Sequence, residues 1–160
     1  MRILVASLLS FFLIGCLSTQ PITFADNKAI AHRGAWKTDS LPQNSIASLR
    51  KAIALKAAGS EFDVRMTKDQ VLIINHDAVY AEDTIELKTY DELAKHKLKN
   101  GEKLPTLEAY LKAGRKYNTQ TRLVVEIKPS LVDKNQGVLA AEKAVALIKE
   151  MKLQHMVAYI

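Results

Sequence analysis

Residues 61–77 read EFDVRMTKDQVLIINHD and decide the fold, because two apolar stretches flank a short polar turn. Successive side chains of a strand point to opposite faces of a sheet, so Glu61 and Asp63 share one face and Phe62 takes the other. Apolar, β-branched residues on both sides of a polar turn indicate a hairpin. The stretch therefore predicts two paired strands that carry two carboxylates on one face.

The register of this hairpin follows from its turn residues. The connection Lys68-Asp69-Gln70 is short, and a two-residue tip of Asp69 and Gln70 is a common hairpin geometry. Counting back from that tip places Asp63 directly opposite His76. We therefore expect a histidine beside the pair of carboxylates.

Strand and helix patterns alternate along the rest of the chain. Such alternation predicts an α/β fold with a parallel sheet. Strands are expected at 29–31, 61–66, 71–75, 123–128 and 156–160, and helices at about 45–58 and 137–152, with shorter helices opening at Thr89 and Thr106.

Two of these helices carry boundary and packing signals. The helix at 45–58 has Asn44 or Ser45 as its N-cap, and Gly59 stands where a left-handed residue would end it. The helix at 137–152 has apolar residues at helical spacing, which predict its buried face: Val138, Ala141, Val145 and Ile148.

The composition is that of a globular protein of one domain. The chain has 160 residues, 48% hydrophobic and 25% charged, with only 6 Gly and 4 Pro. A single cysteine excludes a disulfide framework and a cysteine-based zinc site. The net charge of +6 comes from scattered basic residues rather than a stripe interleaved with aromatics, so the sequence does not favour nucleic-acid binding. It also contains no signal for a protein partner.

The first residues resemble a bacterial lipoprotein signal. Arg2 precedes an apolar run that is too short to span a bilayer, which needs roughly 20 residues. Residues 13–16 resemble a lipobox, in which Cys16 is lipidated and becomes the new N-terminus. Cleavage after Ala25 and an uncleaved signal anchor are the alternatives.

This interpretation divides the chain into three parts: a signal peptide at 1–15, a tether at 16–28 and a folded domain at 29–160. It predicts export to the bacterial cell envelope. A lipid anchor would hold the protein at the periplasmic or outer face of a membrane.

A second strand repeats the polar alternation of the first. In residues 123–128, Glu126 and Lys128 share one face. Three carboxylates facing the interior of a parallel sheet need a cation or a hydrogen-bond network to compensate them. Oxygen ligands favour one divalent cation, Ca²⁺ or Mg²⁺. The alternative is a solvated sheet face with ordinary surface ion pairs.

Two histidines stand at the ends of strands. His76 stands at the end of one apolar run. His32 stands at the end of another, and Arg33 and Gly34 follow His32 directly. Strand ends are where catalytic groups of parallel α/β proteins gather. An arginine suits phosphate, and a glycine lets the backbone approach a ligand closely.

The ordered motifs resemble the glycerophosphodiester phosphodiesterase family. The resemblance covers the chain from Ala29 to the last residue, and its first motif is His32-Arg33-Gly34. The remaining motifs are Leu41-Pro42-Gln43-Asn44-Ser45, Glu61-x-Asp63, His76-Asp77, Leu104-Pro105-Thr106-Leu107 and Glu126-x-Lys128.

The resemblance implies a (β/α)₈ TIM barrel that hydrolyses glycerophosphodiesters, as small-molecule substrates, to an alcohol and sn-glycerol 3-phosphate. It implies metal binding by Glu61, Asp63 and Glu126 and acid and base roles for His32 and His76. It further implies phosphate binding by Arg33 and Lys128. The family usually has Glu where this chain has Gln43, so the resemblance carries over no charged role to that position.

A complete barrel needs roughly 250 residues, so we expect residues 29–160 to form about its first half, with an extra hairpin after the second strand. We expect this length alone to be inactive. The alternatives are a related phospholipase, a sphingomyelinase D-like phosphodiesterase and a non-catalytic envelope lipoprotein.

Overall fold

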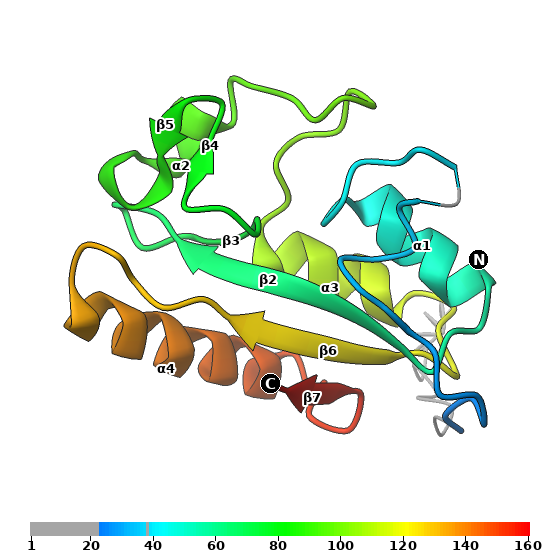
Figure 1. The fold of residues 1–160 in the computed structure, drawn as a ribbon. Helices are drawn as coiled ribbons and strands as arrows, with labels where there is room; N and C mark the ends of the chain where they lie inside the picture. Colours follow the sequence, from blue (N-terminus) through cyan, green and yellow to red (C-terminus); the bar gives the residue numbers. More distant parts are fainter. Residues whose placement is uncertain (1–22, 38) are drawn as a thin grey trace, which may run out of the picture.

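The computed structural model describes residues 23–37 and 39–160. Its main sheet has the strand order β1-β2-β6-β7, in which every neighbouring pair is parallel (Figure 1). A fifth strand, β3, pairs antiparallel with β2. The strands span Ile30–Ala31 (β1), Gly59–Met66 (β2), Leu72–Ile74 (β3), Arg122–Ile127 (β6) and Val157–Tyr159 (β7). The predicted α/β fold with a parallel sheet is confirmed.

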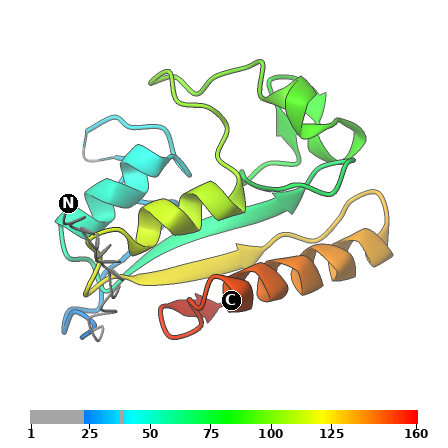
Figure 2. The same cartoon turned by 180° about the vertical axis from the view of Figure 1, so that it is seen from behind.

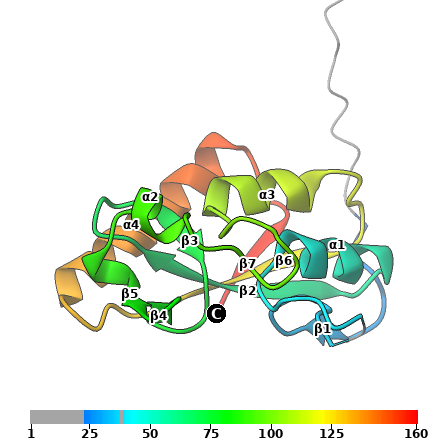
Figure 3. The ribbon, with the colours of Figure 1, turned by 90° about the horizontal axis from the view of Figure 1, so that it is seen from above.

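Three helices cover one face of this sheet: α1 (Ile46–Ala54), α3 (Leu107–Arg115) and α4 (Lys134–Glu150). Figures 2 and 3 show them together on that side. The core lies between the two layers, where the ring of Phe62 packs against Tyr110 with centroids 4.6 Å apart. One strand face is thus filled with apolar side chains, and the other is left for polar ones.

The predicted helix starts are confirmed by capping contacts. The Ser45 hydroxyl accepts from the Ser48 N–H at 3.0 Å and begins α1. Thr106 accepts from the Ala109 N–H in the same way and begins α3. Thr89 and Glu92 form the reciprocal capping box of the short helix α2 (Tyr90–Leu93). Each contact satisfies backbone donors that a helix start leaves unpaired.

The predicted end of α1 was wrong. The helix stops at Ala54, and Lys56 takes the left-handed conformation with φ of +52°. Gly59 is instead the first residue of β2, where a Cβ would lie 3.0 Å from Val124 Cγ2. The lack of a side chain at Gly59 lets β2 and β6 pack closely, and Gly59 does not end a helix.

The predicted buried face of the long helix was also wrong in part. Helix α4 begins earlier than expected because Asp133 caps it by accepting from the Asn135 N–H at 2.9 Å. Its fully buried residues are Ala140, Ala144 and Ile148, whereas Val138 is 53% exposed. Of the predicted stripe, Ile148 alone is fully buried.

The hairpin forms, but its register differs from the expected one by one residue. Residues 68–70 make a three-residue turn, because the Thr67 N–H donates to Val71 O at 3.0 Å and Gln70 adopts φ of +64°. Asn75, not His76, therefore lies opposite Asp63, and its N–H donates to Asp63 O at 3.1 Å.

An inserted segment connects β3 to α3 and was only partly predicted. It contains the small hairpin of β4 (Val79–Tyr80) and β5 (Asp83–Thr84), a 3₁₀ turn at Ile85–Leu87 (η1), and α2. A second, smaller core holds it in place. The buried members of that core are Ile73, Ile85, Leu93 and Leu104.

The described part of the chain contains no helix with the length and apolar character needed to cross a bilayer. The predicted signal peptide and Cys16 lie outside the described residues.

Gly34 shows how tightly the loop after β1 is packed. It adopts φ of +78°, and a Cβ there would overlap the Ser48 side chain and lie 2.7 Å from the Ser48 carbonyl carbon. Gly34→Ala should lower the free energy of unfolding by about 2–4 kcal/mol, because left-handed strain and overpacking add. Urea denaturation measures this.

Gly101→Ala is the matched control. Gly101 also has positive φ, at +83°, but a Cβ there would meet nothing within 4 Å. It should cost only about 1–2 kcal/mol, the strain alone. Equal losses for the two variants would contradict the packing interpretation.

Candidate active site

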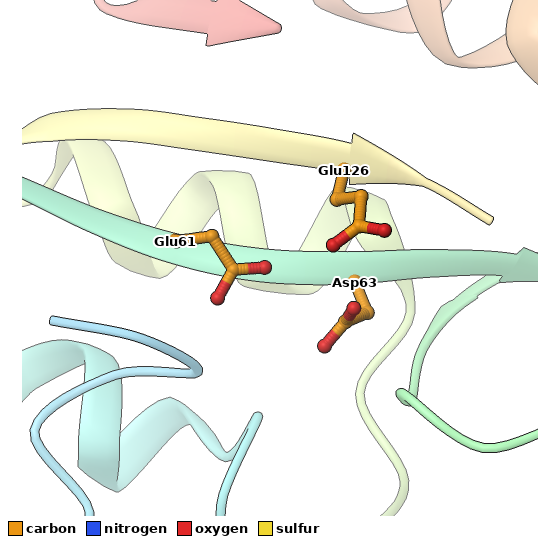
Figure 4. A group of neighbouring side chains, drawn as sticks. All are labelled: Glu61, Asp63 and Glu126. Carbon is orange, nitrogen blue, oxygen red and sulfur yellow. The ribbon is translucent and has the colours of Figure 1, made fainter. Parts of the chain in front are cut away.

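Three carboxylates converge on the face of the sheet that the helices leave uncovered. Glu61 and Asp63 project from β2, and Glu126, directly opposite Asp63 on β6, joins them (Figure 4). One oxygen of each lies within 4.8 Å of the others. Glu61 is 3% exposed and Asp63 is fully buried. The alternation predicted from the sequence therefore brings all three together.

Two of these carboxylates have oxygens without a hydrogen-bond partner. Glu61 Oε1 and Asp63 Oδ1 are buried and accept no hydrogen bond from the described residues. Burial raises the pKa of Glu61, and the charge of Asp63 adds to this, while the Arg33 N–H works in the opposite direction. Orphaned anionic oxygens at this spacing suit a hard divalent cation, which would replace their lost hydration.

Two basic side chains lie against the carboxylates. Arg33 donates its backbone N–H to Glu61 Oε2 at 2.7 Å, and its Nε is 3.7 Å from Asp63 Oδ2. Lys128 Nζ donates to Glu126 Oε1 at 2.7 Å and is 3.4 Å from Asp63 Oδ1. The hydrogen bond to Glu126 raises the pKa of Lys128, so this amine stays protonated. The structure thus places both predicted phosphate-binding residues at the cluster.

His32 and His76 differ in how they approach this cluster. His32 Nε2 is 3.9 Å from Glu61 Oε2, and its side chain is 69% exposed. The His76 ring instead pairs with Asp77, with Nδ1 2.8 Å from Oδ1. His76 is held to the sheet through its backbone, because Arg65 Nε donates to His76 O at 2.9 Å.

Asn44 is a site residue for which the sequence predicted only a possible helix-capping role. Its Nδ2 donates to Asp63 Oδ2 at 2.8 Å, and its Oδ1 accepts from the Asp63 N–H at 3.3 Å. The residue is buried and adopts φ of +59°, which asparagine tolerates better than most residues. It fixes the rotamer of the central carboxylate.

A buried glutamate of the inserted segment holds the loop that follows Lys128. Glu86 Oε2 accepts from Ser130 Oγ at 2.8 Å and from the Val132 N–H at 3.1 Å. Burial lowers the pKa of nearby Arg65, and the charge of Glu86 is the strongest effect opposing this. Neither residue was singled out from the sequence, because the contacts join segments far apart in the chain.

Removing this glutamate should destabilise the protein. Glu86→Ala leaves the Ser130 hydroxyl without its acceptor and removes one of the two acceptors of the Val132 N–H, so we expect the free energy of unfolding to fall by about 1–3 kcal/mol. Thermal or urea denaturation measures it. Glu108→Ala removes an exposed ion pair with Lys112 and should cost less than about 1 kcal/mol. An equal effect of the two variants would contradict the anchoring role.

Charge balance indicates what the site can bind. The cluster combines three carboxylates with two cations, which leaves one net negative charge. A divalent ion would reverse that sign and make the site attractive to an anion. Arg33 and Lys128 would then add their positive charges to that of the ion at the same place.

A family model and individual relatives match this chain. The model of the glycerophosphoryl diester phosphodiesterase family matches residues 32–156. YhdW of Bacillus subtilis, provisionally named a glycerophosphodiester phosphodiesterase, is 34% identical over 111 residues, which cover 62% of this chain and 44% of that protein.

Solved structures match over most of the described chain. A glycerophosphodiester phosphodiesterase from Parabacteroides distasonis is 45% identical with a TM-score of 0.76, covering 83% of this chain and 57% of that one. A phosphodiesterase from Oleispira antarctica, solved with the product sn-glycerol-3-phosphate, has 23% identity and a TM-score of 0.67, covering 83% of this chain and 56% of that one.

These matches confirm the predicted fold, a TIM barrel of which this chain forms a part. The chain spans about half the length of the relatives that it matches.

Proposed function

Because this chain belongs to the glycerophosphoryl diester phosphodiesterase family, we propose that the complete protein hydrolyses glycerophosphodiesters to an alcohol and sn-glycerol 3-phosphate with the help of a divalent ion. The observation that carries this proposal is the cluster of Glu61, Asp63 and Glu126 with Arg33 and Lys128 against it. The comparisons support the family, and the cluster supports the chemistry.

Glu61, Asp63 and Glu126 would hold the ion. Their donors are all carboxylate oxygens, which favours Ca²⁺ or Mg²⁺ over softer metals. When bound, the ion supplies positive charge that stabilises the phosphate oxygens as negative charge develops. Asn44 keeps Asp63 in the rotamer that points toward the other two carboxylates.

The remaining residues would bind and orient the phosphodiester and move protons. Arg33 and Lys128 bind nonbridging phosphate oxygens. One histidine of His32 and His76 accepts the proton of the attacking hydroxyl, which belongs to water or to the substrate glycerol. Attack by the glycerol hydroxyl forms a cyclic phosphate, which water then opens to sn-glycerol 3-phosphate. The other donates a proton to the leaving alkoxide. Imidazole suits both roles because it titrates near neutral pH.

The test compares soluble diesters with intact lipids. The complete protein, loaded with Ca²⁺ or Mg²⁺, should release sn-glycerol 3-phosphate from glycerophosphocholine and leave phosphatidylinositol and sphingomyelin intact. Cleavage of the lipids instead would identify a related phospholipase or a sphingomyelinase D-like enzyme. Failure to bind either ion would favour a non-catalytic envelope lipoprotein. Assayed alone, the 160-residue chain should be inactive, because it spans about half the length of its relatives.

We further propose that the protein is exported and anchored to a membrane of the cell envelope through a lipid on Cys16. The lipobox-like residues 13–16 support this. Cys16→Ser should abolish metabolic labelling with a radioactive fatty acid, since the chain contains no other cysteine. Labelling that persists in this variant would contradict the anchor.

A further inference from the structure

The inserted segment ends in a strongly basic hairpin, residues 95–103, which carries Lys95, Lys97, Lys99 and Lys103. The Leu98 N–H donates to Glu102 O at 2.9 Å, and the turn at Asn100-Gly101 closes it. An isolated antiparallel bridge pairs Lys97 with Lys103. We call this segment the basic hairpin.

Its lysines are exposed and uncompensated. Among the described residues, none of the four forms an ion pair within 4.0 Å. Lysines elsewhere on the described surface do so, as Lys51 does with Asp39 and Lys112 with Glu108. The bridge also sets two like charges directly across from one another, an unfavourable arrangement that a bound anion would relieve.

The one acidic residue of the basic hairpin is already engaged. Glu102 accepts from the N–H groups of Ile46 and Ala47, at 3.0 and 3.1 Å, and from Asn100 Nδ2 at 2.9 Å. Its charge therefore serves the start of α1 rather than the lysines. The same contacts fasten the basic hairpin to that helix.

This attachment places the basic hairpin at the rim of the candidate active site. The two N–H groups that donate to Glu102 lie two and three residues after Asn44, and the Asn44 side chain donates to Asp63. In Figure 1 the inserted segment reaches from the ends of β2 and β3 back to the loop before α1. Lysine charges on a segment attached there add to the electrostatic field that an approaching anion meets.

The chemistry of the basic hairpin fits a small anion better than a lipid surface. It has no exposed large hydrophobic side chain that could enter a bilayer interface. It also contains no Phe, Tyr or Trp on which a nucleic-acid base could stack.

We propose that the basic hairpin selects substrates by charge, favouring glycerophosphodiesters that carry a net negative charge over zwitterionic ones. This proposal rests on the proposed function. A diester such as glycerophosphoglycerol keeps the full phosphate charge, and the lysines attract it as it approaches. Glycerophosphocholine carries a trimethylammonium group that cancels the phosphate charge, so the field of the basic hairpin gives it little advantage.

The test compares two double variants of the complete, metal-loaded protein at about 20 mM salt, where surface charges are weakly screened. Lys97→Gln/Lys103→Gln should lower kcat/KM for glycerophosphoglycerol by roughly threefold, through KM, and change that for glycerophosphocholine by less than about 1.5-fold. At about 500 mM salt the difference should vanish.

Lys116→Gln/Lys149→Gln is the control, because it removes the same charge from exposed positions at the C-terminal ends of α3 and α4. It should leave the ratio of kcat/KM for the two diesters unchanged. The proposal would be overturned if the Lys97→Gln/Lys103→Gln variant kept the wild-type ratio of kcat/KM for the two diesters, whether kcat/KM fell equally for both or for neither.

Two further outcomes separate the possible failures. An unchanged ratio together with lost binding to phosphatidylglycerol vesicles in the Lys97→Gln/Lys103→Gln variant would overturn charge selection and identify a membrane contact. Hydrolysis of neither diester by the wild-type protein would overturn the proposed function itself, and charge selection with it.

Discussion

Replacing either His32 or His76 with alanine in the complete protein should lower kcat by about 10²- to 10⁴-fold, the range typical of a lost general acid or base. The physical reason is that hydroxyl attack on a phosphodiester needs a proton acceptor and the departing alkoxide needs a donor. His32 is close to the carboxylate cluster, with Nε2 3.9 Å from Glu61 Oε2. His76 is fixed by Asp77 and by Arg65.

A measurement of metal affinity shows whether the lower kcat reflects a lost proton-transfer group or a damaged metal site. Calorimetric titration with Ca²⁺ or Mg²⁺ should give the wild-type affinity in both variants, because neither histidine belongs to the carboxylate cluster. His155→Ala, at an exposed position after α4, should retain full activity. Wild-type kcat in both histidine variants would refute the assigned roles.

Replacing Asp63 with asparagine should strongly weaken metal binding and lower turnover with it. Asp63 is the central ligand candidate, since it lies opposite Glu126 and within reach of Arg33, Lys128 and Asn44. Loss of a partner that only orients a ligand already costs about 10- to 100-fold in metal affinity, so loss of the ligand charge should cost at least about 100-fold.

The size of the side chain is kept in the Asp63→Asn variant, so folding should be preserved. The amide oxygen introduced by the substitution can still accept from Asn44 Nδ2, and circular dichroism should show an intact fold. Asp91→Asn, at an exposed position of α2, is the control and should bind metal normally. Tight ion binding by Asp63→Asn would show that the ion, if any, is held elsewhere.

Strand periodicity explains why the acidic cluster could be predicted. A strand alternates its faces strictly, so Glu61 and Asp63 had to share a face whatever the surrounding structure. Glu126 then joined them because β6 pairs with β2 in the register Asp63 to Glu126. The caps at Ser45, Thr89 and Thr106 were equally accessible, since each depends on contacts within three residues.

Turn geometry explains two of the errors, the hairpin register and the end of α1. The hairpin register depended on whether two or three residues form the turn. The three-residue turn places Gln70 in a left-handed conformation, which a glutamine in the sequence does not predict. The end of α1 was predicted wrongly for a similar reason. Lys56 adopts the positive φ after the helix, although Gly59, three residues later, would adopt it with less strain.

The remaining site residues depend on contacts between distant segments. Glu102 reaches Ile46 across 56 positions, and Glu86 reaches Ser130 across 44. A single sequence contains no local pattern for such pairs. Asn44 differs from these residues because it lies within the motif at residues 41–45. Its role at the site still became evident only from its contact with Asp63.

The central claim is that the carboxylate cluster supports metal-dependent hydrolysis of glycerophosphodiesters. The most direct measurement is release of sn-glycerol 3-phosphate from glycerophosphocholine and glycerophosphoethanolamine by the complete protein, with Ca²⁺, with Mg²⁺ and after treatment with EDTA. The account predicts release with at least one ion, none in EDTA, and recovery when the ion is restored. Undiminished release by protein that elemental analysis shows to be metal-free, or no release with either ion, would contradict it.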